Sequence, residues 1–181
     1  MKKNLKRDSS KIDKIVYLAI GISFLTVMVG GLALLPSTSG IIGNIVGEVE
    51  FPDVSFENLE TDSNQDHYVV CPESTCPEQS IDIQSPTYNA SVAEMRSRLL
   101  SFVDNRPNIT LKNLDLVLQQ FDFIERVPGT GFPDIVTVRI IQNMDGTCNL
   151  AIYSRSVIGE GAEGSNKRRA ENWLLVFEAL K

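Results

Sequence analysis

The sequence predicts an α+β protein in which one N-terminal transmembrane helix precedes a domain made of an antiparallel sheet packed with two helices. Three observations predict this arrangement. Residues 15–35 form one apolar run without a charge. Residues 92–104 and 166–180 repeat apolar residues at helical spacing, and the stretches between them alternate apolar and polar residues with the period of strands. This order of elements is typical of an α+β fold.

Residues 15–35 are long enough to cross a bilayer. This run of 21 residues would form a helix of about 31 Å, close to the thickness of the hydrocarbon core. A cleaved signal peptide is an alternative, but the run exceeds the roughly 7–15 residues of a typical apolar core, and only residues 37–39 offer a small-residue cleavage site. A buried core helix rarely has so many apolar residues without a polar face. We therefore expect the lipid bilayer to be the partner of residues 15–35.

Charge is distributed unevenly along the chain. Residues 1–14 carry six basic and two acidic side chains, a net charge of +4, whereas residues 36–181 carry 11 basic and 21 acidic ones, a net charge of −10. Basic flanks stay on the cytoplasmic side of a spanning helix. The chain is thus expected in a cell inner membrane, with a cytoplasmic tail at residues 1–14 and a periplasmic or otherwise extracytoplasmic C-terminal domain. An acidic domain also argues against a nucleic acid partner.

Residues 36–65 are predicted to be a juxtamembrane linker. Apolar residues at helical spacing within residues 41–49 indicate either a short interfacial segment or an ordered linker. Residues 50–66 are acidic, rich in turn-forming residues and without a lasting period, so we expect a tether.

The exported domain is predicted over residues 66–181. Ser91 and Glu94 form the pattern of a capping box, which predicts a helix that continues to about Asp104. After this helix, alternating apolar residues predict strands, and glycine or proline marks the turns between them. The remaining predicted elements are strands over 114–118, 121–123, 136–140 and 148–157, a turn at 128–131, a hairpin at Asp145-Gly146, and a helix over 166–180.

The chain has three cysteines. In an oxidising compartment Cys71 and Cys76 could close a small disulfide ring that stabilises the fold by about 2 kcal/mol. Free thiols and a metal site are the alternatives; His67 would supply only a third ligand, and structural zinc takes four. We favour the disulfide and expect no metal site. Cys148 lies on the apolar face of an alternating run, which predicts a buried, unreactive thiol.

The stretch between the last strand and the last helix contains Gly159-x-Gly161-x-x-Gly164. This spacing matches the dinucleotide-binding fingerprint, but no strand follows the helix to complete a βαβ unit. We therefore expect no cofactor.

The start of the last helix is a candidate anion site. Lys167, Arg168 and Arg169 fall in its first turn, where free backbone N–H groups and a glycine-rich turn can hold a phosphate, sulfate or carboxylate. The alternative is that neighbouring glutamates neutralise these side chains and that one arginine joins the loop to the sheet. The residues predicted for the anion site are Arg126, Asp134, Arg155, Ser156, Gly159, Gly164, Asn166, Lys167, Arg168 and Arg169.

Several of these residues carry a resemblance to a known family. The stretches 132–138 (FPDIVTV) and 151–156 (AIYSRS), followed by Gly159, Gly164 and Asn166, resemble the signature of the domain of unknown function 1499 (DUF1499) family; Arg169, Trp173, Leu174, residues 68–72 and residues 85–86 also fit it. The resemblance covers about residues 64–180 and keeps the spacing. One departure is Ala162, which stands where the family has an aspartate, with Glu163 beside it. The resemblance implies a membrane-anchored or exported envelope domain and no assigned reaction.

The residues favour a binding protein over an enzyme. His67 is the only histidine, and neither G-x-S-x-G nor H-E-x-x-H occurs. The first hypothesis is a binding or scaffolding module of the cell envelope that recognises an anionic ligand or a protein. The second is a cofactor-independent, hydrolase-like enzyme that uses Asp134 and the arginines, although Asp134 could instead cap a turn or pair with an arginine. If these side chains converge in an open pocket, a ligand-binding protein or an enzyme is favoured. If they are buried and bonded to one another, their role is structural.

Overall fold

The computed structural model describes residues 51–62, 65–157 and 163–181. The predicted cytoplasmic tail, the predicted transmembrane helix over residues 15–35 and Gly159 lie outside the described residues. Within the described ranges, no helix combines the length and the apolar character needed to span a bilayer.

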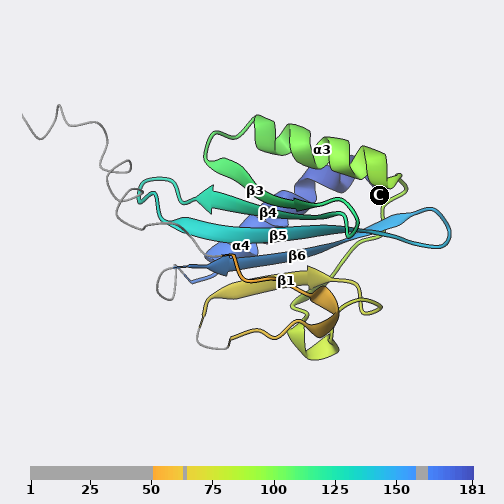
Figure 1. Ribbon diagram of the computed structural model, residues 1–181, viewed down its shortest axis with the longest axis horizontal. Helices are drawn as coiled ribbons and strands as arrows, with labels where there is room; N and C mark the ends of the chain where they lie inside the picture. The colour runs from red at the N-terminus through yellow and green to blue at the C-terminus, as the bar shows by residue number, and fades with distance from the viewer. Residues whose placement is uncertain (1–50, 63–64, 158–162) are drawn as a thin grey trace, which may run out of the picture. The chain divides into compact units, whose positions relative to one another are not determined.

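The domain is built on a mixed six-stranded sheet with the strand order β2-β1-β6-β5-β4-β3 (Figure 1). Strands β3 to β6 form an antiparallel meander, and β1 pairs antiparallel with β6. The expectation of a purely antiparallel sheet is wrong at one edge, because the two-residue β2 runs parallel to β1. The bounds are β1 His67–Cys71, β2 Ile83–Gln84, β3 Ile109–Asp115, β4 Gln120–Arg126, β5 Pro133–Gln142 and β6 Cys148–Ser156.

Local sequence signals account for the turns of the meander. Gly146 has φ +86° in the turn between β5 and β6, a conformation that glycine adopts without strain, as the Asp145-Gly146 pair predicts. The turn between β3 and β4 corrects a prediction. Leu116 and Leu118 were expected in a strand, but they lie in this turn and are exposed, because β3 ends at Asp115 and the Asp115 carboxylate accepts from the backbone N–H of Leu118 at 2.9 Å.

Two helices were expected in the domain, and the described ranges contain two α-helices. Helix α3 (Val92–Asp104) begins with the predicted capping box: Ser91 Oγ accepts from the backbone N–H of Glu94, and the Glu94 carboxylate accepts from the backbone N–H of Ser91. Helix α4 (Ser165–Leu174) is shorter than predicted, because the chain continues as a 3₁₀ helix, η3 (Leu175–Leu180).

One face of the sheet packs against α3, α4 and η3 to form the main core. Trp173 of α4 is its largest fully buried side chain, with its ring 5.0 Å from that of Phe123 and 5.1 Å from that of Phe102. Cys148 is buried and unpaired, and burial raises the pKa of its thiol, which agrees with the predicted inert thiol.

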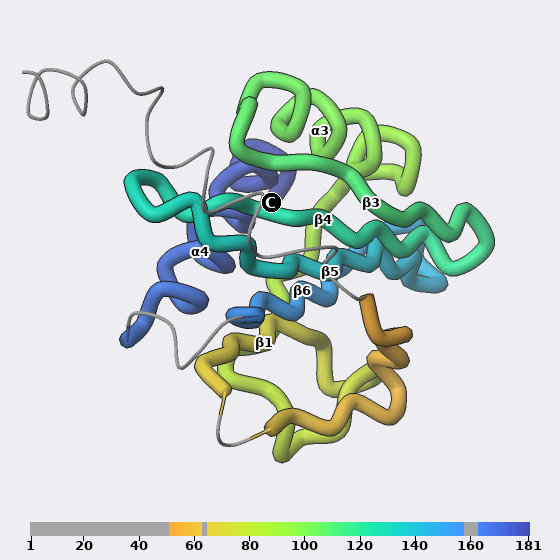
Figure 2. Tube along the Cα trace, turned by 60° about the vertical axis from the view of Figure 1, so that its left-hand side comes forward, coloured from red at the N-terminus to blue at the C-terminus, as the bar shows by residue number. Residues whose placement is uncertain are grey.

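The opposite face of the sheet is covered by residues 51–62 and by the loop after β1. Figure 2 shows both segments on the side of the sheet away from α3. Phe56, in the short 3₁₀ helix η1 (Phe56–Asn58), and Leu59 are buried against Ala151 and Tyr153 in a second apolar cluster. The prediction of a free tether over residues 50–66 is therefore wrong for residues 51–62, which are part of the domain.

Hydrogen bonds and a disulfide hold this covering layer. The loop after β1 contains a second 3₁₀ helix, η2 (Glu78–Ser80), and Ser80 Oγ donates to the carbonyl of Leu59 at 2.7 Å. Arg139 of β5 pairs with Glu57 at 2.7 Å. Cys71 and Cys76 form a disulfide, the pairing that the sequence favoured, with Cα atoms 6.1 Å apart.

If residues 51–62 belong to the folded domain, Phe56→Ala will lower its free energy of unfolding by about 3–5 kcal/mol, because a fully buried ring is removed. Denaturant titration of the full chain in detergent measures this loss. Val117→Ala, at a side chain that is 92% exposed, is the control and should change stability by less than about 0.5 kcal/mol. Equal effects of the two substitutions would show that the segment is a tether.

Candidate functional site

Strand β6 divides the predicted site residues between the two faces of the sheet. Successive side chains of a strand point to opposite faces. Ser154 and Ser156 bond to residues of α4, on the helix-covered face, whereas Tyr153 packs with the cluster under residues 51–62. Arg155 lies with Tyr153 on that second face, its guanidinium 4.6 Å from the Tyr153 ring. The predicted convergence of Arg155 with Arg169 therefore does not occur.

On the helix-covered face, Asp134 and Arg169 form a buried ion pair. Asp134 lies near the start of β5 and Arg169 in the second turn of α4. Glu125 adds a second negative charge, with its Oε2 3.7 Å from Arg169 Nε, and the same oxygen accepts from Trp173 Nε1–H at 2.8 Å. The pair thus joins the sheet to the helix beside the main core.

Asn166 completes this network and is fully buried. Its amide nitrogen donates to Ser156 Oγ at 3.0 Å and to the backbone carbonyl of Asp66 at 2.8 Å. Its amide oxygen accepts from Ser154 Oγ at 2.8 Å and from the Arg169 guanidinium. The first residues of α4 are therefore bonded to β6 and to the chain just before β1.

The network explains the electrostatics of Asp134. Burial raises the pKa of the Asp134 carboxyl above its ordinary value, against the lowering effect of the Arg169 guanidinium. With only 5% of its surface exposed, Asp134 has no open path to a substrate. The arrangement matches the structural alternative, in which an arginine ties the loop to the sheet and Asp134 pairs with it.

The other predicted residues lie apart from this network. Arg126 ends β4, and its guanidinium donates to the carbonyl of Gly131 at 3.1 Å, which holds the neighbouring turn. Lys167 and Arg168 are exposed on α4. Gly164 precedes α4 with φ +67°. The described part of the chain thus offers no single place where all predicted anion-binding side chains meet.

Removing Arg169 should strongly destabilise the domain. We expect Arg169→Met to reduce the free energy of unfolding by about 3–5 kcal/mol, because Asp134 is then left buried without its partner. Denaturant unfolding of the full chain in detergent measures the change. Adding Asp134→Asn to Arg169→Met should recover part of the loss, since the uncompensated charge disappears. Arg168→Met, on the exposed side of α4, serves as the control, and a loss no larger than this control would contradict a structural role.

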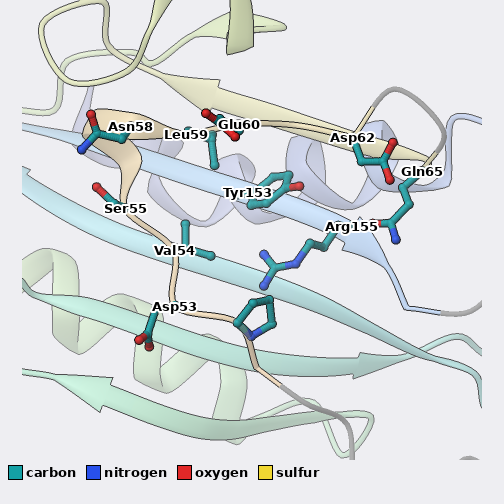
Figure 3. A pocket seen from close by; sticks show the side chains of 11 residues that line it. Asp53, Val54, Ser55, Asn58, Leu59, Glu60, Asp62, Gln65, Tyr153 and Arg155 are labelled. Carbon is teal, nitrogen blue, oxygen red and sulfur yellow. The ribbon is translucent and has the colours of Figure 1, made fainter.

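A cavity of about 350 Å³ opens on the face of the sheet that residues 51–62 cover (Figure 3). Two neighbouring residues of β6, Tyr153 and Arg155, form its floor, and the covering segment forms its walls. Its lining consists of Pro52, Asp53, Val54, Ser55, Asn58, Leu59, Glu60, Asp62, Gln65, Tyr153 and Arg155.

Arg155 is the most unusual group in this cavity. Only 6% of its surface is exposed, and its Nη2 has no hydrogen-bond partner among the residues that the structure describes. Its Nη1 is 3.4 Å from Thr137 Oγ1, a long contact, and Figure 3 shows the guanidinium turned toward the covering segment near Val54. Burial lowers the pKa of the Arg155 guanidinium below its usual range, and arginine side chains stay charged in proteins.

The charge of Arg155 is compensated only indirectly by the described residues. The Asp122 carboxylate favours the charged form of Arg155, and it accepts from Thr137 Oγ1 at 2.7 Å and from Asn113 Nδ2 at 3.2 Å. Thr137 therefore stands between the two charges. A buried guanidinium with a free donor is energetically unfavourable unless an anion reaches it, because a buried charge needs both a counter-charge and hydrogen bonds.

The cavity was missed at the sequence level because residues 51–62 were assigned to the tether. A signal was present: Phe56 and Leu59 are three residues apart in an otherwise acidic segment, the spacing of one face of a helical turn. A second signal is the alternation of side chains along a strand, which places Arg155 on the opposite face of the sheet from Ser154 and Ser156. In the described ranges, no cluster of three histidine, cysteine or acidic side chains is arranged to bind a metal ion.

Comparison with known proteins assigns no family to the chain. No protein-family model matches the chain, and no curated protein matches its sequence. The resemblance to the DUF1499 family stays a prediction.

Proposed function

We propose that the chain is a single-pass membrane protein whose exported α+β domain is a binding module of the cell envelope, with an anionic group of its ligand bound at Arg155. The observation that carries the proposal is the buried Arg155 guanidinium, which forms part of the cavity floor and whose Nη2 has no hydrogen-bond partner within residues 51–62, 65–157 and 163–181. A protein tolerates such a charge where it serves function, because stability and function trade off at binding sites.

The placement outside the cytoplasm rests on three supports. Residues 15–35 have the length and composition of a spanning helix, and their basic flank orients the N-terminus to the cytoplasm of an inner membrane. The disulfide between Cys71 and Cys76 belongs to an oxidising compartment. The DUF1499 resemblance favours the same location.

The enzyme hypothesis has less support. Its general acid or base, Asp134, is engaged with Arg169 and lies on the other face of the sheet from Arg155. The described residues of the lining include no histidine, cysteine or lysine, and Ser55 among them donates to Glu57 at 3.2 Å instead of bonding to a general base. A cofactor-independent hydrolase would need an activated nucleophile here.

Arg155→Gln should separate ligand binding from stability. For the wild-type chain in detergent, we expect 4-methylpentanoate, a small monocarboxylate, to raise the free energy of unfolding by about 2.7 kcal/mol at a hundred times its Kd. The variant should lose this increase and, without ligand, be at least as stable as wild type, because an unpaired buried charge is removed. Arg168→Gln is the matched control and should respond like wild type. Equal stabilisation of Arg155→Gln by the carboxylate would refute the site.

The membrane placement makes a separate prediction. A reporter that folds only outside the cytoplasm should be active when fused after Lys181 and inactive when fused after Lys14, because the spanning helix lies between them. Alkaline carbonate washing should leave the intact chain in the membrane fraction. Release by carbonate, or a silent reporter after Lys181, would contradict this topology.

A further inference from the structure

We infer that the turn between β3 and β4 contacts lipid: Leu116, Val117 and Leu118 insert into the interface of the bilayer that anchors the chain. This inference rests on the membrane placement in the proposed function and adds a second contact between the exported domain and the membrane. It follows from an apolar turn whose backbone polar groups are bonded within the turn.

The apolar side chains of this turn face solvent. Val117 is 92% exposed, Leu116 58% and Leu118 43%. Met144, in the turn between β5 and β6, is fully exposed, and Figure 1 and Figure 2 both show the two turns at the same end of the sheet. Single exposed apolar residues are ordinary, but several together at one end of a domain mark an interaction site.

The backbone of the turn is suited to an environment without water. The Asp115 carboxylate accepts from the backbone N–H of Val117 at 2.7 Å and from that of Leu118 at 2.9 Å. The Gln119 side-chain amide donates to the carbonyl of Leu116. Unpaired backbone groups are costly in lipid, where no water can bond to them. The turn can therefore leave water without leaving these three groups unpaired.

Gln119 fixes the turn in this conformation. It has φ +52°, a backbone conformation that is uncommon for a residue other than glycine. Its side-chain oxygen accepts from Arg96 of α3 at 3.1 Å, and its backbone carbonyl accepts from the N–H of Ile140 at 3.0 Å. A glycine could not make the bond to Arg96. Because the turn is held in place before it meets a partner, it loses little conformational freedom on insertion.

The size of the patch and the length of the tether favour lipid over a protein partner. A stable protein–protein interface buries roughly 800 Å² per partner, far more than the side chains of one turn provide. Residues 36–50 join the predicted spanning helix to the first described residue, and these 15 residues reach at most about 54 Å when extended. The bilayer is thus always near, and a high effective concentration compensates for weak insertion.

Charge near the turns indicates which lipid is suitable. Residues 113–119 and 143–147 include Asp115 and Asp145 but no lysine or arginine. Anionic lipids attract basic side chains, so these turns gain nothing from them. We expect insertion into zwitterionic phosphatidylcholine and no stronger insertion when phosphatidylglycerol is added.

Tryptophan fluorescence of the full chain reconstituted into phosphatidylcholine vesicles tests the inference. Val117→Trp places an indole in the turn, and the signal of the buried Trp173, measured on the unsubstituted chain, is subtracted. Lipid brominated in the upper part of its acyl chains should quench the new tryptophan at least about twofold, since interfacial segments lie roughly 5–10 Å deep. Thr130→Trp, in the exposed turn between β4 and β5 at the opposite end of the sheet, is the control and should not be quenched.

Two substitutions at Asp115 test the role of the bonded backbone. In the Val117→Trp background, Asp115→Asn keeps an acceptor oxygen and should keep the quenching. Asp115→Ala makes the turn more apolar but frees two N–H groups, so it should lower the quenching at least about twofold. Leu116→Ser, at an exposed position, should also lower it. Circular dichroism of each variant checks that the domain is folded.

The outcomes separate this inference from the proposed function. An unquenched Val117→Trp, or equal quenching of Thr130→Trp, overturns the lipid contact. Stronger quenching in Asp115→Ala than in Asp115→Asn, or with added phosphatidylglycerol, overturns it too, because the contact would then follow general apolar character or charge. If these results occur in a chain that resists carbonate washing, the membrane placement stands. Release of the chain by carbonate overturns the placement itself.

Discussion

Complete burial of strand β6 is the constraint on which the rest of the structure depends. All nine of its side chains are buried, so its polar residues cannot rely on water for hydrogen bonds. Ser154 and Ser156 meet this requirement through Asn166 and Arg169 on the helix-covered face. Arg155 meets it only in part on the other face, since its Nη2 has no partner among the described residues. Strand β6 therefore supplies two serines that bond to α4 on one face and an incompletely bonded arginine on the other.

The two faces use buried charge differently. Around Arg169 the charges are paired at short range, and the pair fixes the position of α4 on the sheet; replacing one partner leaves an uncompensated charge, although such pairs add little net stability compared with an apolar core. Around Arg155, Thr137 lies between the guanidinium and the Asp122 carboxylate. The first arrangement is what a structural role requires. The second leaves a donor available, which is what recognition of an anion requires.

Much of the fold could be predicted from the sequence because its signals are local. The capping box at Ser91, the glycine turn at Gly146 and the period of β5 and β6 depend on neighbouring residues. Phe56 packs on Tyr153, almost a hundred positions away in the sequence, and a local periodic pattern cannot predict such a contact. The parallel pairing of the two-residue β2 is equally non-local. The residues of the candidate site were chosen because they are close in sequence. Strand alternation instead turns Arg155 of β6 away from the face of the sheet on which Arg169 of α4 packs.

The covering segment links the cavity to the rest of the chain. Residues 51–62 form most of its walls and follow directly after the stretch predicted to join the domain to the membrane. Gln120 donates to the carbonyl of Val54 at 3.0 Å, Arg139 pairs with Glu57, and Ser80 donates to the carbonyl of Leu59, so polar contacts as well as the apolar cluster hold the segment. A ligand that binds only when this segment is packed must stabilise the packed state, by RT ln(1 + [L]/Kd). If the proposed anionic ligand binds in the cavity, its binding is thermodynamically coupled to the packing of residues 51–62 on the sheet.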